Sequence, residues 1–187
     1  MEEELEFIFE SVKEAMTSAI KHLEKKLLNI RAGKANTSML GSVVVEYYGS
    51  LTPLTQVANV NTPDGRTIVV QPWEKKLLVD IEKAIMNANL GFNPMNNGEN
   101  IIINVPALTE ERRIDLVRKA KSEGEHAKVS IRSQRKDAND MVKYLKDEGL
   151  SEDGIKESEE NIQKLTDYFT KKVDELIAVK EADIMKV

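Results

Sequence analysis

The chain has 187 residues, of which 41% are hydrophobic and 32% are charged, and its formal net charge is -5. These proportions are typical of a helix-rich folded protein with one domain of ordinary size or two small ones. The lack of cysteine excludes disulfides and thiol catalysis, and the lack of any apolar run of about 18 residues excludes a membrane-spanning helix.

The first predicted element is a helix from Glu3 to about Ile30. Apolar residues recur there at steps of three and four, with no interior glycine or proline, which is typical of an amphipathic helix. We expect Gly33 to cap its C-terminal end. Glu2, Glu3 and Glu4 make the start of the chain acidic, unlike a secretory signal, so we expect a cytoplasmic protein.

The middle of the chain has the composition of β-structure. Ser42–Gly49 is β-branched and aromatic and ends at glycine, which predicts a strand. Pro63-Asp64-Gly65 predicts a hairpin turn. In chain order we expect a strand at 42–49, a short extended piece at 51–54, a hairpin of 56–61 with 66–71, a helix at 73–89, a turn at 93–98 and a strand at 100–105.

Two more helices are predicted after Pro106. Thr109 precedes two glutamates, which is a favourable helix start, and the pattern continues to about Asp147. Gly149 then ends this helix and Ser151 supplies the N-cap of the final one, whose apolar residues run from Ile155 to Ile184.

Three long amphipathic helices, none able to bury its apolar face alone, predict an antiparallel three-helix bundle. We therefore expect an α+β protein with a bundle of residues 1–31 and 107–187 and an inserted β/α/β sandwich domain at 32–106. Two short connections join them, so we expect an elongated, L-shaped molecule with a hinge. The expected hinge residues are Ala32, Gly33, Pro106 and Ala107.

The sequence offers no catalytic constellation. His22 and His126 lie on different predicted helices without metal-ligand spacing, and no Gly-rich phosphate loop or zinc motif is present. We expect no catalytic residues, no metal and no cofactor, and we do not expect an enzyme.

Positive charge is concentrated on one face of the predicted second helix. At 100° per residue, the lysines and arginines from 118 to 146, with the exception of Lys119, project into one quadrant. They are Arg118, Lys121, Lys128, Arg132, Arg135, Lys136, Lys143 and Lys146. Like charges four residues apart cost about 0.2–0.5 kcal/mol per pair. A polyanion partner would explain this segregation in an acidic chain, whereas the alternative is a solvated face with salt bridges to acidic neighbours.

A nucleic-acid backbone fits a row of cations with arginine at its centre, because the guanidinium binds phosphate in a bidentate manner. RNA is favoured over DNA, since no motif that reads base pairs is present. Arg31 and Lys34 extend this surface or, equally on spacing alone, serve as partners of the helix dipole.

Several sequence blocks resemble the bacterial ribosome recycling factor family, in the same order and over essentially the full chain. They are Ile30–Ala35, Val44–Gly49, Leu90–Pro94, Leu108–Arg113, Arg135–Asp140 and the terminal Lys180–Asp183. The resemblance implies a three-helix bundle with an inserted domain that binds the large ribosomal subunit. With elongation factor G and GTP hydrolysis, the family splits post-termination ribosomes into subunits.

The resemblance also implies residue roles. Arg132 and Arg135 match rRNA-contacting arginines of the family, and Arg31 matches another at the elbow. Lys34 and Lys128 stand where the family often has arginine. The expected rRNA-binding residues are Arg31, Lys34, Lys128, Arg132, Arg135 and Lys136. We expect a monomer without membrane contact; the alternative is a helical-bundle chaperone or adaptor with an inserted recognition domain.

Overall fold

The structure is a computed structural model that describes residues 1–186. The chain divides into two compact units. Unit 1 combines Met1–Ala32 with the chain from Glu110 onward, and unit 2 is Gly33–Thr109. The predicted helical bundle and the inserted β/α/β domain are both confirmed. No helix within residues 1–186 is long and apolar enough to cross a membrane.

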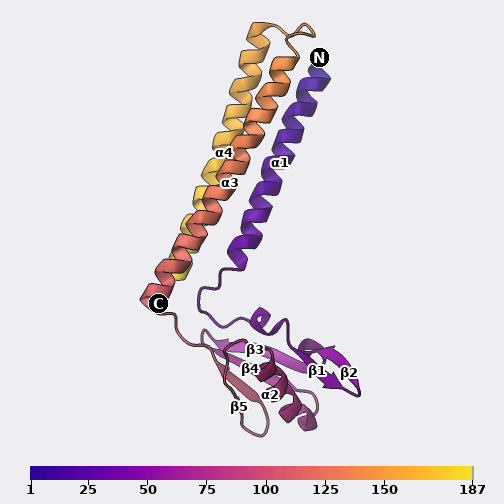
Figure 1. Ribbon diagram of the computed structural model, residues 1–187, viewed down its shortest axis with the longest axis vertical. Helices are drawn as coiled ribbons and strands as arrows, with labels where there is room; N and C mark the ends of the chain where they lie inside the picture. The colour runs from indigo at the N-terminus through magenta and orange to yellow at the C-terminus, as the bar shows by residue number, and fades with distance from the viewer. Residues whose placement is uncertain (187) are drawn as a thin grey trace. The chain divides into compact units, whose positions relative to one another are not determined.

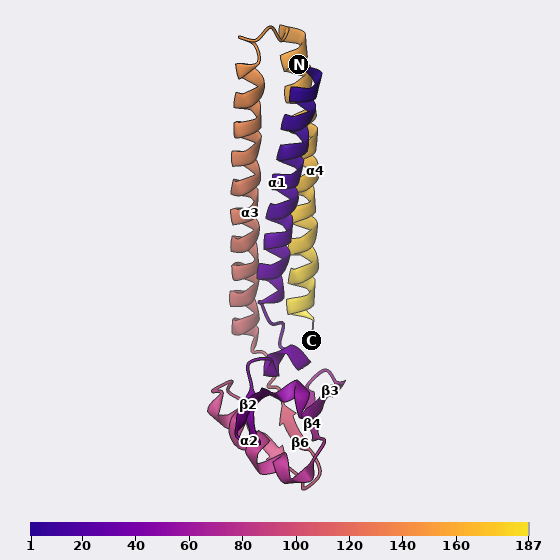
Figure 2. The same cartoon turned by 90° about the vertical axis from the view of Figure 1, so that its right-hand side faces the viewer.

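Unit 1 is a bundle of three long helices, α1 (Glu2–Leu28), α3 (Glu110–Tyr144) and α4 (Glu152–Met185), which run side by side in both views (Figures 1 and 2). The start of α1 lies beside the end of α3, since residues 3–8 and 141–145 line one groove. The ends of α1 and α4 lie together, since residues 24–28 and 176–183 line another. Helix α3 is therefore antiparallel to both of its neighbours.

The apolar periodicity of each helix forms the core of unit 1. Met16 of α1, Ile131 of α3 and Val173 of α4 are all fully buried. Gly124 allows α4 to approach α3 closely, because a Cβ atom at this position would lie 2.7 Å from Cγ1 of Ile177. Gly124 thus has a packing role in the bundle.

One of the predicted helix ends is confirmed and another is wrong. The Ser151 hydroxyl accepts a hydrogen bond from the Gly154 N–H at 3.1 Å, which confirms the predicted N-cap of α4. The predicted cap at Gly33 is wrong, because α1 ends at Leu28 with Asn29 as its C-cap. Ile30 is buried although it lies beyond the helix, so the apolar pattern extends past the helical backbone.

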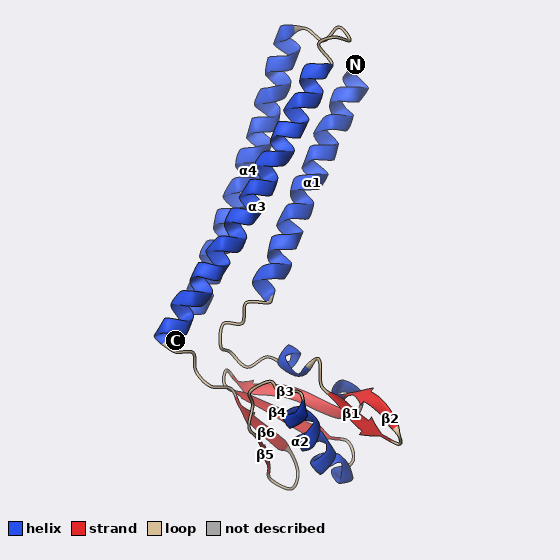
Figure 3. Ribbon diagram, in the orientation of Figure 1, coloured by secondary structure: helices blue, strands red, loops and turns tan. Residues whose placement is uncertain are grey.

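Unit 2 contains two antiparallel sheets and one α-helix (Figure 3). The hairpin of β1 and β2 forms the first sheet, and the second has the strand order β3-β4-β6-β5. The strands are β1 (Val44–Tyr47), β2 (Ser50–Pro53), β3 (Ala58–Asp64), β4 (Thr67–Pro72), β5 (Pro94–Asn96) and β6 (Ile101–Asn104). The helix is α2 (Leu78–Asn87), and short 3-10 turns occupy Thr37–Leu40, Leu54–Gln56 and Lys75–Leu77.

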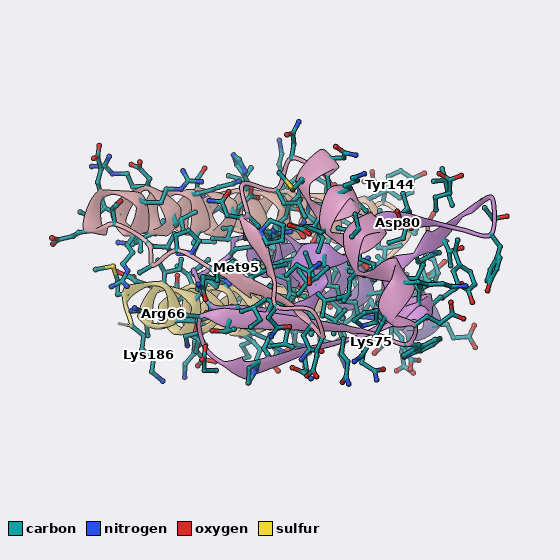
Figure 4. The ribbon with its side chains drawn as sticks, turned by 90° about the horizontal axis from the view of Figure 1, so that it is seen from below. Arg66, Lys75, Asp80, Met95, Tyr144 and Lys186 are labelled. Atoms are coloured by element: carbon teal, nitrogen blue, oxygen red, sulfur yellow. The ribbon has the colours of Figure 1, made fainter. Side chains whose placement is uncertain are left out.

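The core of unit 2 lies between α2 and the four-stranded sheet. Ile68 of β4 and Ile103 of β6 are fully buried in one apolar cluster with Ile81 of α2. The side chains of Arg66, Lys75, Asp80 and Met95, which are labelled in Figure 4, are exposed.

Two local features of unit 2 concern its turns. The turn predicted at Pro63-Asp64-Gly65 is confirmed by the pairing of β3 with β4. The Asp64 carboxylate accepts hydrogen bonds from the Arg66 N–H and the Thr67 hydroxyl, which lower its pKa. The stretch 93–98, expected to be only a turn, contains β5, whose Met95 pairs with Ile102 of β6.

Gly33 lies where the chain enters unit 2, against the segment by which the chain leaves it. Its φ is +76°, and a Cβ atom there would lie 2.6 Å from Cγ of Leu108. We expect Gly33→Ala to lower the free energy of unfolding of unit 2 by about 1–2 kcal/mol, the usual cost of a left-handed non-glycine residue, plus a cost for displacing Leu108. Hydrogen exchange of the β4 and β6 amides measures this effect.

Gly49→Ala is the matched control for this prediction. Gly49 has a φ of +80°, but no atom lies within 4 Å of the place that a Cβ atom would occupy. The control variant therefore has the free-energy cost of a left-handed alanine but no clash with another side chain. Equal losses of protection in the two variants would show that the Leu108 contact contributes nothing.

Candidate nucleic-acid interface

The predicted cationic face lies on α3, but its members do not share one environment. Lys121, Lys128 and Arg135 border α4, which is shown by their partners on that helix. Arg132 and Lys136 lie on the outer side of α3, where both are exposed. The structure therefore divides most of the predicted stripe into an α4-facing row and an outer pair. Arg118 belongs to neither group and pairs with Asp115 of α3 itself at 3.9 Å.

Four lysines of the α4-facing row form ion pairs with carboxylates of α4. The pairs are Lys121–Glu181 at 3.8 Å, Lys128–Asp174, Lys143–Glu159 at 3.9 Å and Lys146–Glu152 at 3.6 Å. In three of these pairs the two residues stand at equal distances along the chain from Ser151, and Lys146 and Glu152 stand at equal distances from Gly149. These charges are matched within the bundle, as the alternative interpretation of the stripe requires.

Lys128 and Arg135 are the two predicted rRNA-binding residues in this row. The Lys128 side chain is only 19% exposed and contacts both Asp174 and Glu125. The Arg135 guanidinium is partly buried and donates a hydrogen bond to Oε1 of Gln163 at 3.2 Å. An external phosphate must compete with these partners for both side chains.

The outer pair is better placed for an external ligand. The Arg132 side chain is 54% exposed, and its only ion pair among the described residues joins it to Glu125 at 4.0 Å. Lys136 makes no ion pair within residues 1–186. Such exposed ion pairs contribute only about 0–1 kcal/mol. One helical turn, about 5–6 Å along the axis, separates the two cations.

Arg31 and Lys34, the other two predicted residues, do not lie on α3. Arg31 is exposed in the coil that follows α1 and belongs to unit 1. Lys34 is exposed but belongs to unit 2. Arg31 lies beyond Asn29, the C-cap of α1, so the role of both residues as dipole partners in the last helical turn is not supported.

Two features of this region were not predicted from the sequence. The acidic residues of α4 that match the lysines could have been found from their mirrored positions about the turn at residues 149–151. His22 and His126, which lie on different helices as predicted, line the same groove of about 700 Å³ between α1 and α3. The two histidines share this groove because α1 and α3 are antiparallel.

Comparison with known proteins gives one consistent result. A family model described as "Ribosome recycling factor" matches residues 23–185. The ribosome-recycling factor of Flavobacterium psychrophilum is 62% identical over the full length of both chains. That of Cytophaga hutchinsonii is 50% identical and covers 99% of this chain and 100% of its own.

Solved structures agree with this result. A solution structure of the ribosome recycling factor is 38% identical, covers 98% of each chain and has a TM-score of 0.73. A second structure contains the T. thermophilus ribosome recycling factor and the E. coli elongation factor G bound to the E. coli post-termination complex. Its matching chain is 44% identical over 97% of this chain and 99% of its own, with a TM-score of 0.60.

Proposed function

This chain belongs to the ribosome recycling factor family, from which we infer that it recycles ribosomes after translation termination. It binds the large ribosomal subunit and, together with elongation factor G and GTP, splits the post-termination ribosome into subunits. The family match over residues 23–185 carries this proposal. The T. thermophilus relative bound with elongation factor G to a post-termination complex supports the choice of partner.

The outer face of α3 is the proposed rRNA contact. Arg132 and Lys136 are exposed and at most weakly paired, so binding phosphate breaks little existing structure. Phosphate contacts by such cations provide affinity without reading sequence. Arg31 and Lys34 contribute as exposed cations outside α3, whereas Lys128 and Arg135 contribute only after releasing their partners on α4.

The protein acts in this proposal as a mechanical adaptor and not as an enzyme. The sequence has no Gly-rich phosphate loop, so the GTP is bound and hydrolysed by the elongation factor. Unit 1 remains anchored on rRNA while force on unit 2 is transmitted through the hinge residues Ala32, Gly33, Pro106 and Ala107. The chain works as a cytoplasmic monomer without a cofactor of its own.

A subunit-splitting assay tests this function directly. Light scattering follows purified post-termination ribosomes after the chain is added alone, with elongation factor G, and with elongation factor G plus GTP. We expect the scattering to fall only in the complete mixture. Splitting by the chain alone, or unchanged scattering in the complete mixture, would contradict the proposal.

A further inference from the structure

The end of the bundle that holds the N-terminus carries an apolar groove between α1 and α3. Phe7 and Ile8 of α1 face Met141, Tyr144 and Leu145 of α3 across a space of about 380 Å³. Phe7 is 71% exposed and Tyr144 is 66% exposed, so these aromatic side chains lie open to solvent. Clustered exposed aromatic residues are typical of a surface that binds another molecule.

Carboxylates of both helices lie in or next to this groove. Glu3 and Glu4 line it directly. Asp137 and Asp140 are exposed and stand four residues before Met141 and Tyr144, which places them on neighbouring positions of the same helix face. Glu4 pairs with the N-terminal ammonium group, but Glu3, Asp137 and Asp140 make no ion pair within residues 1–186.

The unpaired charge distinguishes the groove from the α4 side of the bundle. There, carboxylates such as Asp174 are matched with lysines of α3. Around the groove, acidic side chains remain unmatched next to apolar ones. An acidic rim repels RNA phosphates and equally repels the same acidic groove of a second copy. It attracts lysine and arginine, while the floor accepts apolar side chains.

We propose that this groove docks a basic protein segment of the large ribosomal subunit. Apolar side chains of the segment pack between Phe7 and Tyr144, and its lysines or arginines face Glu3, Asp137 and Asp140. The inference rests on the proposed function for its setting, since it takes the large subunit as the surface on which the chain is bound. It adds a protein contact at the bundle end to the rRNA contact of α3.

Photo-crosslinking on purified large subunits tests the proposal. In one form of the full-length chain, p-benzoylphenylalanine replaces Tyr144. In a second form it replaces Ser133, which is exposed next to Arg132. Both are bound to large subunits, pelleted and irradiated, and the products are identified by nuclease digestion and mass spectrometry. We expect crosslinks from position 144 to a Lys/Arg-rich protein segment, and crosslinks from position 133 to RNA.

Variants that remove negative charge test whether the carboxylates beside the groove contribute to docking. Asp137→Asn combined with Asp140→Asn in the position-144 form should lower the yield of the protein crosslink at least threefold at equal occupancy. The control, Glu160→Gln with Glu175→Gln, removes two exposed carboxylates of α4 and should leave the yield unchanged. An equal loss in both variants would show a non-specific charge effect and would overturn the proposal.

The remaining outcomes separate the inference from the function on which it rests. Crosslinks from position 144 to RNA, or none at all from a chain that pellets with the subunits, overturn the docking site and leave the proposed function standing. Failure of both forms and of the unsubstituted chain to pellet overturns the proposed function, and the docking site with it.

Discussion

Replacing Arg132 with alanine is expected to weaken binding to purified large subunits by about 1–3 kcal/mol, which is a loss of roughly 5- to 150-fold in affinity. A guanidinium forms charge-assisted, bidentate hydrogen bonds with phosphate, and alanine removes all of them. The fold should be nearly unaffected, because Arg132 is exposed and its ion pair with Glu125 is 4.0 Å long. Pelleting or fluorescence anisotropy at fixed salt measures the affinity.

Two further variants show whether the position of the cation and the geometry of the guanidinium group cause this loss of affinity. Lys143→Ala removes one cation from the same helix that borders α4 near Glu159 and is not among the predicted rRNA-binding residues, so its loss should change the affinity much less. Arg132→Lys keeps the charge but loses the planar fork, and an intermediate affinity is expected. If Arg132→Ala and Lys143→Ala bind alike, the outer face of α3 is not the contact surface.

The neighbouring substitution Ile131→Ala should lower the stability of the bundle and leave the affinity for large subunits nearly unchanged. Ile131 is fully buried in the bundle, and truncating such a side chain costs about 2–5 kcal/mol through lost burial and the cavity that remains. Urea unfolding, monitored by the far-ultraviolet circular dichroism of the helices, measures this loss of stability. Domains of this kind are typically stable by about 5–15 kcal/mol, so the variant should remain folded in buffer and should bind large subunits with nearly normal affinity.

Val129→Ala is the control for Ile131→Ala. Val129 is on the same helix but is exposed, so its truncation should change the free energy of unfolding by less than about 0.5 kcal/mol. A folded Ile131→Ala variant that loses as much ribosome affinity as Arg132→Ala would mean that core packing, and not the outer cation, determines binding.

The sequence predicts the helices well because each helix carries its own apolar periodicity. The residues at steps of three and four in α1 that were expected to face the core, such as Met16 and Leu23, are buried. Strand β5 was missed because Pro94-Met95-Asn96 has no β-branched residue, and it forms only by pairing with β6. A strand that depends on its neighbour leaves little signal in its own residues.

The candidate interface shows the same limit. Periodicity placed eight cations of the predicted second helix on one face, but it could not show that α4 borders part of this face. Lys128 looked equivalent to Arg132 on a helical wheel, yet Asp174 contacts the lysine and no residue of α4 forms an ion pair with the arginine among the described residues. Whether a cation remains available to an external ligand depends on which residues of the neighbouring helix contact it. The roles of the six predicted rRNA-binding residues stay predictions that the variants above test.

The ion pairs between α3 and α4 also have a consequence for how the two helices are aligned. Exposed pairs of this kind add little to stability, but they are satisfied in one alignment only. If α4 slid by one helical turn toward its own C-terminus, Lys146 would leave Glu152 and face the region of Glu148. A slide in the other direction would bring it to Lys156. Lys128 would exchange Asp174 for Thr170 or Ala178. The ion pairs therefore favour the same register of α4 against α3 that brings Ile177 close to Gly124.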